Sequence, residues 1–379
     1  MVKYRFEQIA INSTEKKKPV EEDRFTYLGL EHLDSGSLKV TRFGSEVAPI
    51  GEKLVMHKGD VLFGKRRAYQ KKVAIAPFDG IFSAHGMVLR PREDVIDKSL
   101  FPLFISSDYF LDAAIKISVG SLSPTINWRD LKTLEFELPD LATQRKLAET
   151  LWSINDTMET YKKLIAATDE LVKSQFMELF GDPVTNTQGR EVRPFKDFML
   201  DIRYGTSQPP TFNELGEFKF IRATNIKAGR ITENGMLRIS ADEAAKIEKC
   251  RLNGNEIIIV RSGANTGDTC VVTDEYRDQY AGYDIIVTLN LEIANPVFFN
   301  ELMNTHYMQA IIKPLTVRAA QPHINSEQVQ NLPMLVVPLQ EQEQFATFVR
   351  QSDKSKFELE KALSELTATY KRIIAENLG

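Results

Sequence analysis

The sequence predicts an α+β fold in which two related mixed α/β domains are separated by two long helices, which pair as a coiled coil in a pseudo-twofold arrangement. An internal duplication and a heptad pattern lead to this expectation. Residues 138–181 recur as 337–379. Gly379 lies 198 residues after Gly181, and the same offset aligns Gln144 with Gln342 without a gap. A period this long indicates a duplicated globular domain followed by a helix, because solenoid repeats run only about 20–50 residues.

Both recurring stretches carry the period of 3.5 residues that is typical of a coiled coil. The expected contact positions are Leu151, Ile154, Met158, Tyr161, Ile165, Thr168, Val172, Gln175 and Leu179, then Val349, Ser352, Lys356, Leu359, Leu363, Leu366, Tyr370, Ile373 and Asn377. Thr168, Gln175, Ser352, Lys356 and Asn377 are polar, which indicates that the contact favours one register of the helices over maximal stability. Two separately buried helices are the alternative, but the matching phase favours mutual pairing.

Prolines and glycines mark the ends of the two helices. Each stretch begins after a proline, Pro139 or Pro338, and ends at a glycine, Gly181 or Gly379, where a C-terminal cap is expected. The chain then divides into four segments. These are a first domain at 1–137, a central spacer helix at 138–184, a second domain at 185–336 and a distal spacer helix at 337–379.

Within the domains, shorter elements also recur. Residues 24–40 and 218–234 each suggest two short strands joined by a turn, with Gly36 and Gly229 aligned at an offset of 193. Asn295 and Pro296 are expected to cap and open a helix that continues to residue 313. Its counterpart opens at Phe101.

Composition limits the function classes. A length of 379 residues favours two to three domains, and no apolar run approaches the ~18–20 residues of a membrane span. The N-terminus lacks an export signal, and two cysteines suit neither a disulfide framework nor a metal site. We therefore expect a reduced, cytoplasmic protein. Because the net charge is −4, nucleic-acid binding would have to come from local patches.

One such patch lies between Asp60 and Asp79, where there are five basic side chains and no acid. The candidate DNA-binding residues are Lys65, Arg66, Arg67, Tyr69, Gln70, Lys71 and Lys72. They supply cations for phosphates, guanidinium groups for guanine edges and an amide for adenine edges. The alternative is a solvated hairpin tip.

The second half has a loop at the same place, residues 254–272, which we align at an offset of 195, with Gly254 on Gly59 and Arg261 on Arg66. Its candidate DNA-binding residues are Arg261, Ser262, Asn265 and Thr266. Glycines allow this backbone to approach a surface closely. Two homologous loops with different polar side chains suit two domains that recognise different sequences.

A third segment, 315–325, holds the candidates Arg318, Gln321 and His323, and matches residues 117–127 of the first half. Proximity to DNA and a plain loop both remain open for it.

The sequence contains no complete catalytic motif. Gly64-Lys65 ends an incomplete phosphate-binding loop that lacks its Ser or Thr, and the five histidines show no ligand spacing. The chain carries no recognisable catalytic or metal site.

The order of these features resembles the specificity subunit of Type I restriction–modification systems. In each half a strand that follows Gly-Asp or Gly-Asn precedes a polar loop, followed by a helix opened at proline, a Pro-x-Ile-Asn turn and a long heptad helix. The motifs PLQEQ at 338–342 and NLPMLVVP at 331–338 carry the resemblance, which covers nearly the whole chain. Thr143, where an acidic residue is usual, and the unusually basic first loop depart from the pattern.

This resemblance implies a function in phage defence. Each domain would be a target-recognition domain for one half of a bipartite double-stranded DNA site. The two long helices would form an antiparallel coiled coil that sets the gap. The chain would not be an enzyme and would bind no cofactor. It would dock two methyltransferase subunits, which use S-adenosylmethionine, and motor-nuclease subunits, which use ATP and Mg²⁺. The alternative is a coiled-coil adaptor with two protein-binding domains, against which the basic loop argues.

Overall fold

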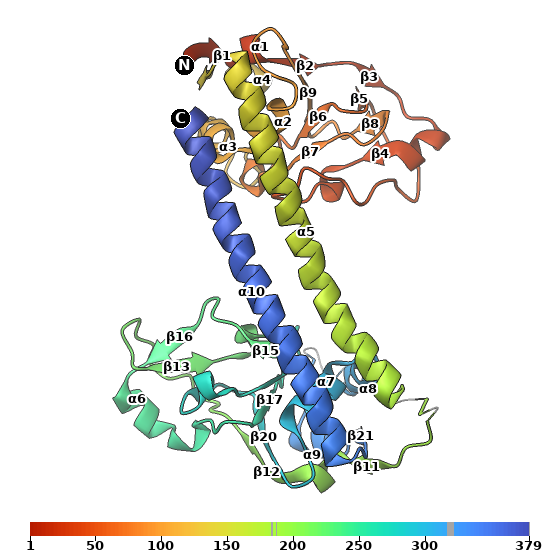
Figure 1. The fold of residues 1–379 in the computed structure, drawn as a ribbon, viewed down its shortest axis with the longest axis vertical. Helices are drawn as coiled ribbons and strands as arrows, with labels where there is room; N and C mark the ends of the chain where they lie inside the picture. The colour runs from red at the N-terminus through yellow and green to blue at the C-terminus, as the bar shows by residue number, and fades with distance from the viewer. Residues whose placement is uncertain (183–184, 187, 317–321, 379) are drawn as a thin grey trace. The chain divides into compact units, whose positions relative to one another are not determined.

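The computed structural model describes the chain except for residues 183–184, 187, 317–321 and 379. The chain forms two compact units, Met1–Lys163 with Leu359–Gly379, and Leu164–Glu358. Two helices of 40 residues, α5 (Leu141–Phe180) and α10 (Leu339–Leu378), each contribute to both units, and each unit also holds one domain (Figure 1). In the part of the chain described, no helix is long and apolar enough to cross a membrane.

The first domain contains two four-stranded sheets and short helices. Its elements are β1 (Val2–Arg5), α1 (Phe6–Ile9), β2 (Ala10–Ser13), β3 (Lys16–Lys17), β4 (Tyr27–Leu28), β5 (Lys53–Met56), β6 (Val61–Phe63), β7 (Val73–Ile75), β8 (Gly80–Phe82), β9 (Met87–Pro91), α2 (Phe101–Ser106), α3 (Asp108–Lys116), α4 (Trp128–Leu131) and β10 (Glu135–Leu138). One sheet is antiparallel, in the order β2-β9-β6-β7. The other has the order β3-β5-β8-β4, with β4 and β8 parallel, and β1 pairs with β10.

The second domain repeats one of these four-stranded sheets and part of the other. Its elements are β11 (Val192–Pro194), β12 (Met199–Tyr204), β13 (Phe218–Ile221), β14 (Ile226–Lys227), β15 (Arg230–Ile231), β16 (Leu237–Ile239), α6 (Ala241–Lys246), β17 (Ile257–Ile259), β18 (Thr269–Val271), β19 (Tyr280–Ala281), β20 (Ile285–Leu289), α7 (Pro296–Asn304), α8 (His306–Thr316), α9 (Ser326–Gln330) and β21 (Pro333–Leu335). The sheet β12-β20-β17-β18 copies β2-β9-β6-β7, and the parallel pair β13–β19 copies β4–β8. The predicted duplication is confirmed.

A buried glutamine in the first turn of each long helix makes the same hydrogen bonds. Gln144 is 1% exposed; its Nε2 donates to the carbonyls of Pro139 and Val95, 2.8 and 3.0 Å away, and its Oε1 accepts from the Asp97 amide. Gln342 makes the equivalent bonds to Val337, Ile293 and Asn295. The offset of 198 is therefore structural, and it fixes the start of each helix to its own domain.

The predicted cap at Asn295 is confirmed. The prediction of one continuous helix over 296–313 is wrong, because the chain forms the two helices α7 and α8 there. The Asn295 side chain accepts from the amides of residues 297 and 298, with Pro296 in the first turn. Thr305 then ends α7 and caps α8, because its hydroxyl donates to the Leu302 carbonyl and accepts from the Met308 amide. Ser107 separates α2 from α3 in the same way.

The two long helices pack against one another within each unit. In the first unit Leu147 and Leu151 of α5 share a core with Ile374 and Leu378 at the end of α10. In the second unit the end of α5 shares a core with the start of α10, through the residues Val172, Phe176, Phe180, Phe345 and Val349. The beginning of one helix therefore meets the end of the other, which confirms the antiparallel pairing.

The heptad positions are correct along most of both helices but not at the end of α5. Leu179, expected at the contact, is 43% exposed, whereas Phe176 and Phe180 are buried. Their rings contact those of Phe298 and Phe345 at centroid distances of 5.1–5.8 Å. The helix faces the second domain here as well as its partner helix, so the buried stripe drifts with the 3.6-residue turn. Gly181, with φ 73°, forms the predicted cap, and Gly379 lies outside the described residues.

An ion pair explains one polar contact position. Lys356 is buried on α10, and its Nζ lies 2.6 and 2.7 Å from the two carboxylate oxygens of Asp169 on α5. Any other register would bury the ammonium group without a partner, which is costly. The pair therefore favours a single alignment of the helices, as the polar positions predicted.

Two more carboxyl groups, those of Asp353 and Glu301, share a partly buried site with Asp169 in the second unit. Asp353 of α10 pairs with Arg230 of β15, and Glu301 of α7 accepts from the side chain of Asn300. Burial, and secondly the nearby Asp353, raise the pKa of Glu301 to about 7. A protonated Glu301 carries no charge, so it limits the negative charge that gathers beside Asp353 and Asp169.

We predict that Glu301→Gln removes a pH-dependent part of the stability. Because the pKa of Glu301 is raised above its ordinary 4.5, the stabilisation is complete below that value and is lost as the pH rises through about 7. Between pH 4.5 and 8 the variant should gain at most about 3 kcal/mol relative to wild type. Denaturant midpoints over this range measure it. Glu343→Gln, at an exposed position of α10, is the control, and equal pH profiles for the wild type and Glu301→Gln would contradict the assignment.

Candidate nucleic-acid interface

The basic loop of the first domain is a tight turn between β6 and β7. Its ends are joined by a hydrogen bond from the Gly64 amide to the Lys72 carbonyl, 2.9 Å long. Arg67 and Lys71 have left-handed backbones, with φ of 54° and 48°. Such conformations cost about 1–3 kcal/mol in residues other than glycine, so the turn holds these side chains against a local preference.

The corresponding loop of the second domain shows that the predicted alignment is wrong by one residue. Gly263 and Gly267 take the left-handed positions of Arg67 and Lys71, at an offset of 196. The Ile126 amide donates to the Lys65 carbonyl, and the equivalent bonds of the second domain join Ile324 and Arg261. Arg261 therefore corresponds to Lys65, and Ser262 corresponds to Arg66. Gly59 corresponds to Asn255, since both have positive φ. The sequence could not reveal this shift of one residue, because neither loop contains apolar residues that would fix the alignment.

Three side chains of the first loop face solvent. Arg67 and Tyr69 are exposed, Tyr69 to 56%, and no described residue bonds either side chain. Arg66 is exposed too and donates to the Ser123 hydroxyl, 3.1 Å away, with the His85 ring at 3.4 Å. Burial, and then the charges of Arg66 and other cations, lower the pKa of His85. The loop and its neighbours thus form a local positive site.

The other cations of this loop have structural partners. Lys71 pairs with Asp108 and Asp112 of α3, at 2.8 and 2.7 Å. Burial lowers the pKa of Lys71, but these bonds outweigh it and raise the pKa. Lys72 donates to the Leu30 carbonyl, 2.6 Å away. We therefore expect Arg66, Arg67 and Tyr69, rather than these two lysines, to be accessible to DNA; Gln70 is partly buried.

Lys65 lines a cavity of about 230 Å³ with Lys16, Asn12 and Trp128. Burial, and then Lys16, lower the pKa of Lys65. Both lysines are close enough to favour an anion or an electronegative base edge in this hollow. The sequence did not indicate Lys16 because it lies about 50 residues upstream of Lys65.

Residues 117–127 form a second loop beside the basic one. Arg66 and Thr125 form a β-bridge, and the Ala68 amide donates to the Pro124 carbonyl. Leu122 in this loop is 93% exposed. The sequence comparison identified only the serines and threonine of this segment, and an isolated leucine between serines gives no signal by itself.

In the second domain, Arg261 is held by two aromatic rings. Its guanidinium carbon lies 4.4 Å from the ring centroid of Tyr204 and 4.3 Å from that of Tyr283. Its backbone amide donates to the buried Asp284. Sequence reasoning found Arg261 but missed both tyrosines, although Tyr283 lies 198 residues after His85, at the offset of the duplication.

The remaining candidates of this domain divide into three groups. Ser262 forms a β-bridge with His323, so these two lie together, as Arg66 and Thr125 do in the first domain. The Thr266 hydroxyl is buried and donates to the carbonyls of Gly263 and Pro322, which assigns it to loop structure, and Asn265 donates weakly to Ala223 at 3.5 Å. Arg318 and Gln321 lie outside the described residues.

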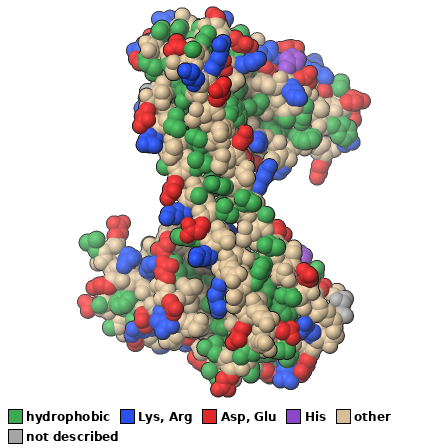
Figure 2. All heavy atoms as spheres, viewed as in Figure 1, with side chains coloured by type: hydrophobic (Ala, Val, Ile, Leu, Met, Phe, Trp, Pro, Cys, Tyr) green, Lys and Arg blue, Asp and Glu red, His purple; other side chains and the backbone are tan. Residues whose placement is uncertain are grey.

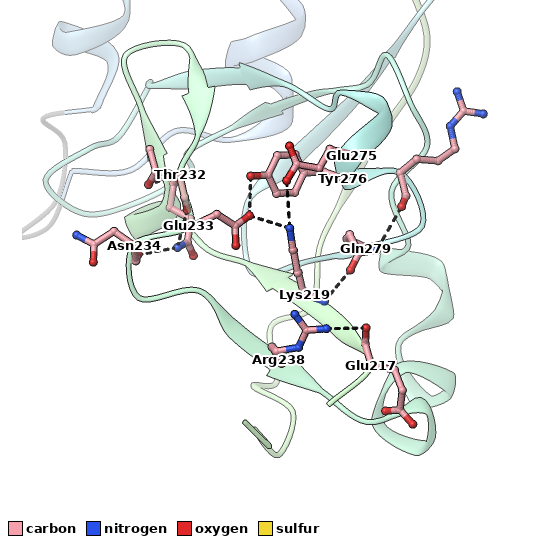
Figure 3. A network of polar contacts seen from close by, with 11 residues as sticks. Glu217, Lys219, Thr232, Glu233, Asn234, Arg238, Glu275, Tyr276 and Gln279 are labelled. Carbon is pink, nitrogen blue, oxygen red and sulfur yellow. Dashed lines mark hydrogen bonds and ion pairs between the residues drawn. The ribbon is translucent and has the colours of Figure 1, made fainter. Parts of the chain in front are cut away.

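A charged cluster elsewhere in the second domain is paired within the chain (Figure 3). Lys219 Nζ lies 2.8 Å from Glu233 and 3.3 Å from Glu275, and the Tyr276 hydroxyl donates to Glu233. The hydrogen bond from Lys219 holds the pKa of Glu233 below its ordinary value. This cluster joins β13 to two turns, and its lysine is paired with two carboxylates, so we assign it to the fold.

One face of the molecule shows no broad field of a single charge. On the face drawn in Figure 2, basic and acidic side chains are interspersed. A cavity of about 740 Å³ in the first unit lies between α3 and the helix pair, and there Asp108 joins Lys71 to Lys371. Among the described residues, no group of His, Cys, Asp or Glu could hold a metal ion. The accessible polar loops are therefore the candidate interface.

Comparison with known proteins identifies the family of this chain. The model of the Type I restriction modification DNA specificity domain matches residues 19–168 and 191–367. The specificity subunit of the Escherichia coli Type I restriction enzyme EcoDI is 26% identical over 187 residues, which are 48% of this chain and 41% of that relative. The match thus spans less than half of the relative's length.

Two solved structures share the fold. The S subunit of a Type I restriction–modification system from M. genitalium has a TM-score of 0.61 at 15% identity, covering 100% of this chain and 96% of that one. A chain from a study of the assembly and conformational transition of a Type I system has a TM-score of 0.55 at 18% identity, covering 99% and 97%. With the two matched segments, which span most of its length, the chain belongs to the family of Type I restriction modification DNA specificity domains, and it carries two copies of that domain.

Proposed function

We propose that this chain recognises a bipartite site in double-stranded DNA, with one domain on each half-site. The observation that carries the proposal is the repetition of one loop scaffold, with the same left-handed positions and the same bond to a neighbouring loop, under different side chains. The first copy presents Arg66, Arg67 and Tyr69, and the second presents Arg261 and Ser262. Equivalent scaffolds with unlike donors are suited to unlike base sequences.

The long helices are proposed to set the gap between the half-sites. Each is continuous over 40 residues and contributes to both units. The Lys356–Asp169 pair supports a fixed register for them. A spacer of fixed register would convert its length into a fixed separation along the duplex.

The chain is proposed to act as the non-catalytic recognition subunit of a Type I complex. Its partners would be two methyltransferase subunits, which use S-adenosylmethionine, and motor-nuclease subunits, which use ATP and Mg²⁺. Support comes from the family and from the likeness to a chain solved in a study of how a Type I system assembles. On this proposal the cofactors belong to the partners, and the chain itself contributes DNA contacts and docking surfaces.

We expect Arg66→Ala with Arg67→Ala to weaken DNA binding by the complex with its methyltransferase. Each phosphate contact that is lost should flatten the log–log salt dependence by about 0.9. Affinity measured between low and moderate salt tests this. Lys98→Ala with Lys163→Ala removes two exposed cations from the same unit and is the matched control. An unchanged slope in the arginine variant would exclude this loop from the interface.

Exchange of residues 185–336 for the same segment of a relative should change one half of the methylated motif. The first half should stay intact, because its loops belong to the other domain. Mapping of methylated adenines in cells that carry the chimaera and the methyltransferase measures this. Simultaneous change of both halves, or of neither, would contradict separate recognition.

Insertion of one heptad into each long helix should lengthen the gap. Seven residues add about 10.5 Å of helix, roughly three base pairs at 3.4 Å each, and they keep the contact positions in phase. Because three base pairs turn the duplex by about 100°, some affinity should be lost to DNA twisting. Four-residue insertions, which rotate the contact face, are the control. An active heptad variant with the original gap would show that another element sets the distance.

A further inference from the structure

The guanidinium of Arg261 is in contact with two aromatic rings. Tyr204 and Tyr283 lie on it at centroid distances of 4.4 and 4.3 Å, and cation–π attraction acts at both contacts. A side chain with several rotatable bonds is thereby ordered before any ligand arrives. Ordering in advance reduces the entropy cost of binding. Tyr283 is 43% exposed, so the stack lies at the surface.

The edge of the same group has donors without acceptors. Among the described residues no hydrogen bond reaches the guanidinium, and its Nε is buried without a partner. The cation–π contacts with the rings leave the hydrogen-bond donors unpaired, and all five N–H groups of an arginine point outward in its plane. Leaving a buried donor unpaired costs about 1–3 kcal/mol. The two Nη groups are unpaired among the described residues and, unlike Nε, are not buried, so they are the donors that an external acceptor can reach.

We propose that Arg261 recognises a guanine in the half-site of the second domain, an inference that rests on the proposed function. The major-groove edge of guanine presents O6 and N7, a planar pair of acceptors that matches two N–H groups of a fixed guanidinium. Arg261 is on the loop that corresponds to the basic loop of the first domain, next to Ser262 and its bridge to His323.

The surroundings favour a base over a phosphate. The Asp284 carboxyl accepts from the Arg261 backbone amide, 3.0 Å away, and is buried. Burial raises its pKa to about 6, so it is mostly ionised at neutral pH. A phosphate placed on the Arg261 edge would bring a second negative charge close to it, whereas a guanine edge is neutral.

The first domain lacks this arrangement. Lys65 occupies the position of Arg261, and strand register places Thr14 where the second domain has Tyr204. His85 takes the position of Tyr283. Without the aromatic stack, Lys65 lines an open cavity instead. The arginine held by two aromatic rings is therefore a feature of the second domain alone.

The test uses the full chain in its complex with the methyltransferase. Once the wild-type motif is mapped, affinity is measured for the cognate site and for sites with each base pair substituted. In the wild type, one G·C pair of the second half should be discriminated about ten- to hundredfold. Arg261→Ala should lose discrimination at that pair alone, and Arg261→Gln should shift it toward adenine, since glutamine pairs with the adenine edge.

Controls separate the possible failures. Arg277→Ala removes an exposed arginine of the same domain and should leave every preference unchanged. Retained penalties in the first half show that a variant is folded. Equal weakening on all sites, with every second-half penalty kept, would indicate a phosphate contact and overturn the inference. A wild-type complex with no sequence preference would instead refute the proposed function, and this inference with it.

Discussion

The structure depends on a buried glutamine at the start of each long helix. Gln144 and Gln342 have little or no exposure, and each has bonds to two carbonyls and one amide of the preceding domain. A buried amide without these partners would be costly, so the bonds define a single angle at which the helix leaves its domain. The same contact made twice gives each helix a fixed starting point, from which its partner contacts follow.

Polar groups then select how the helices meet. Apolar heptads alone tolerate sliding by whole heptads, but the buried Lys356 finds its carboxylate at one register only. The neighbouring site with Asp353, Arg230 and Glu301 extends this selection to the second domain. Some stability is given up for it, since apolar residues would pack there at lower electrostatic cost.

The loops show how a common backbone can carry different chemistry. Left-handed positions are filled by Gly263 and Gly267 in one domain and by Arg67 and Lys71 in the other. Lys71 recovers its backbone strain through two ion pairs, whereas Arg67 faces solvent. The fold fixes where the loop lies, and its side chains decide what it contacts.

The sequence by itself determined the duplication, the long helices and their pairing, and it located the candidate loops, because periodicity and repeated motifs are local patterns. Only the tertiary structure decided which candidates are accessible. The side chains of Lys71 and Thr266 are polar, but both bond to residues that are distant in the sequence. Phe180 is buried in place of Leu179 where the second domain packs against α5. Arg261 stands between two rings that lie 57 residues before it and 22 after it. Such long-range contacts leave no local pattern, because they arise when separate strands meet in the folded sheet.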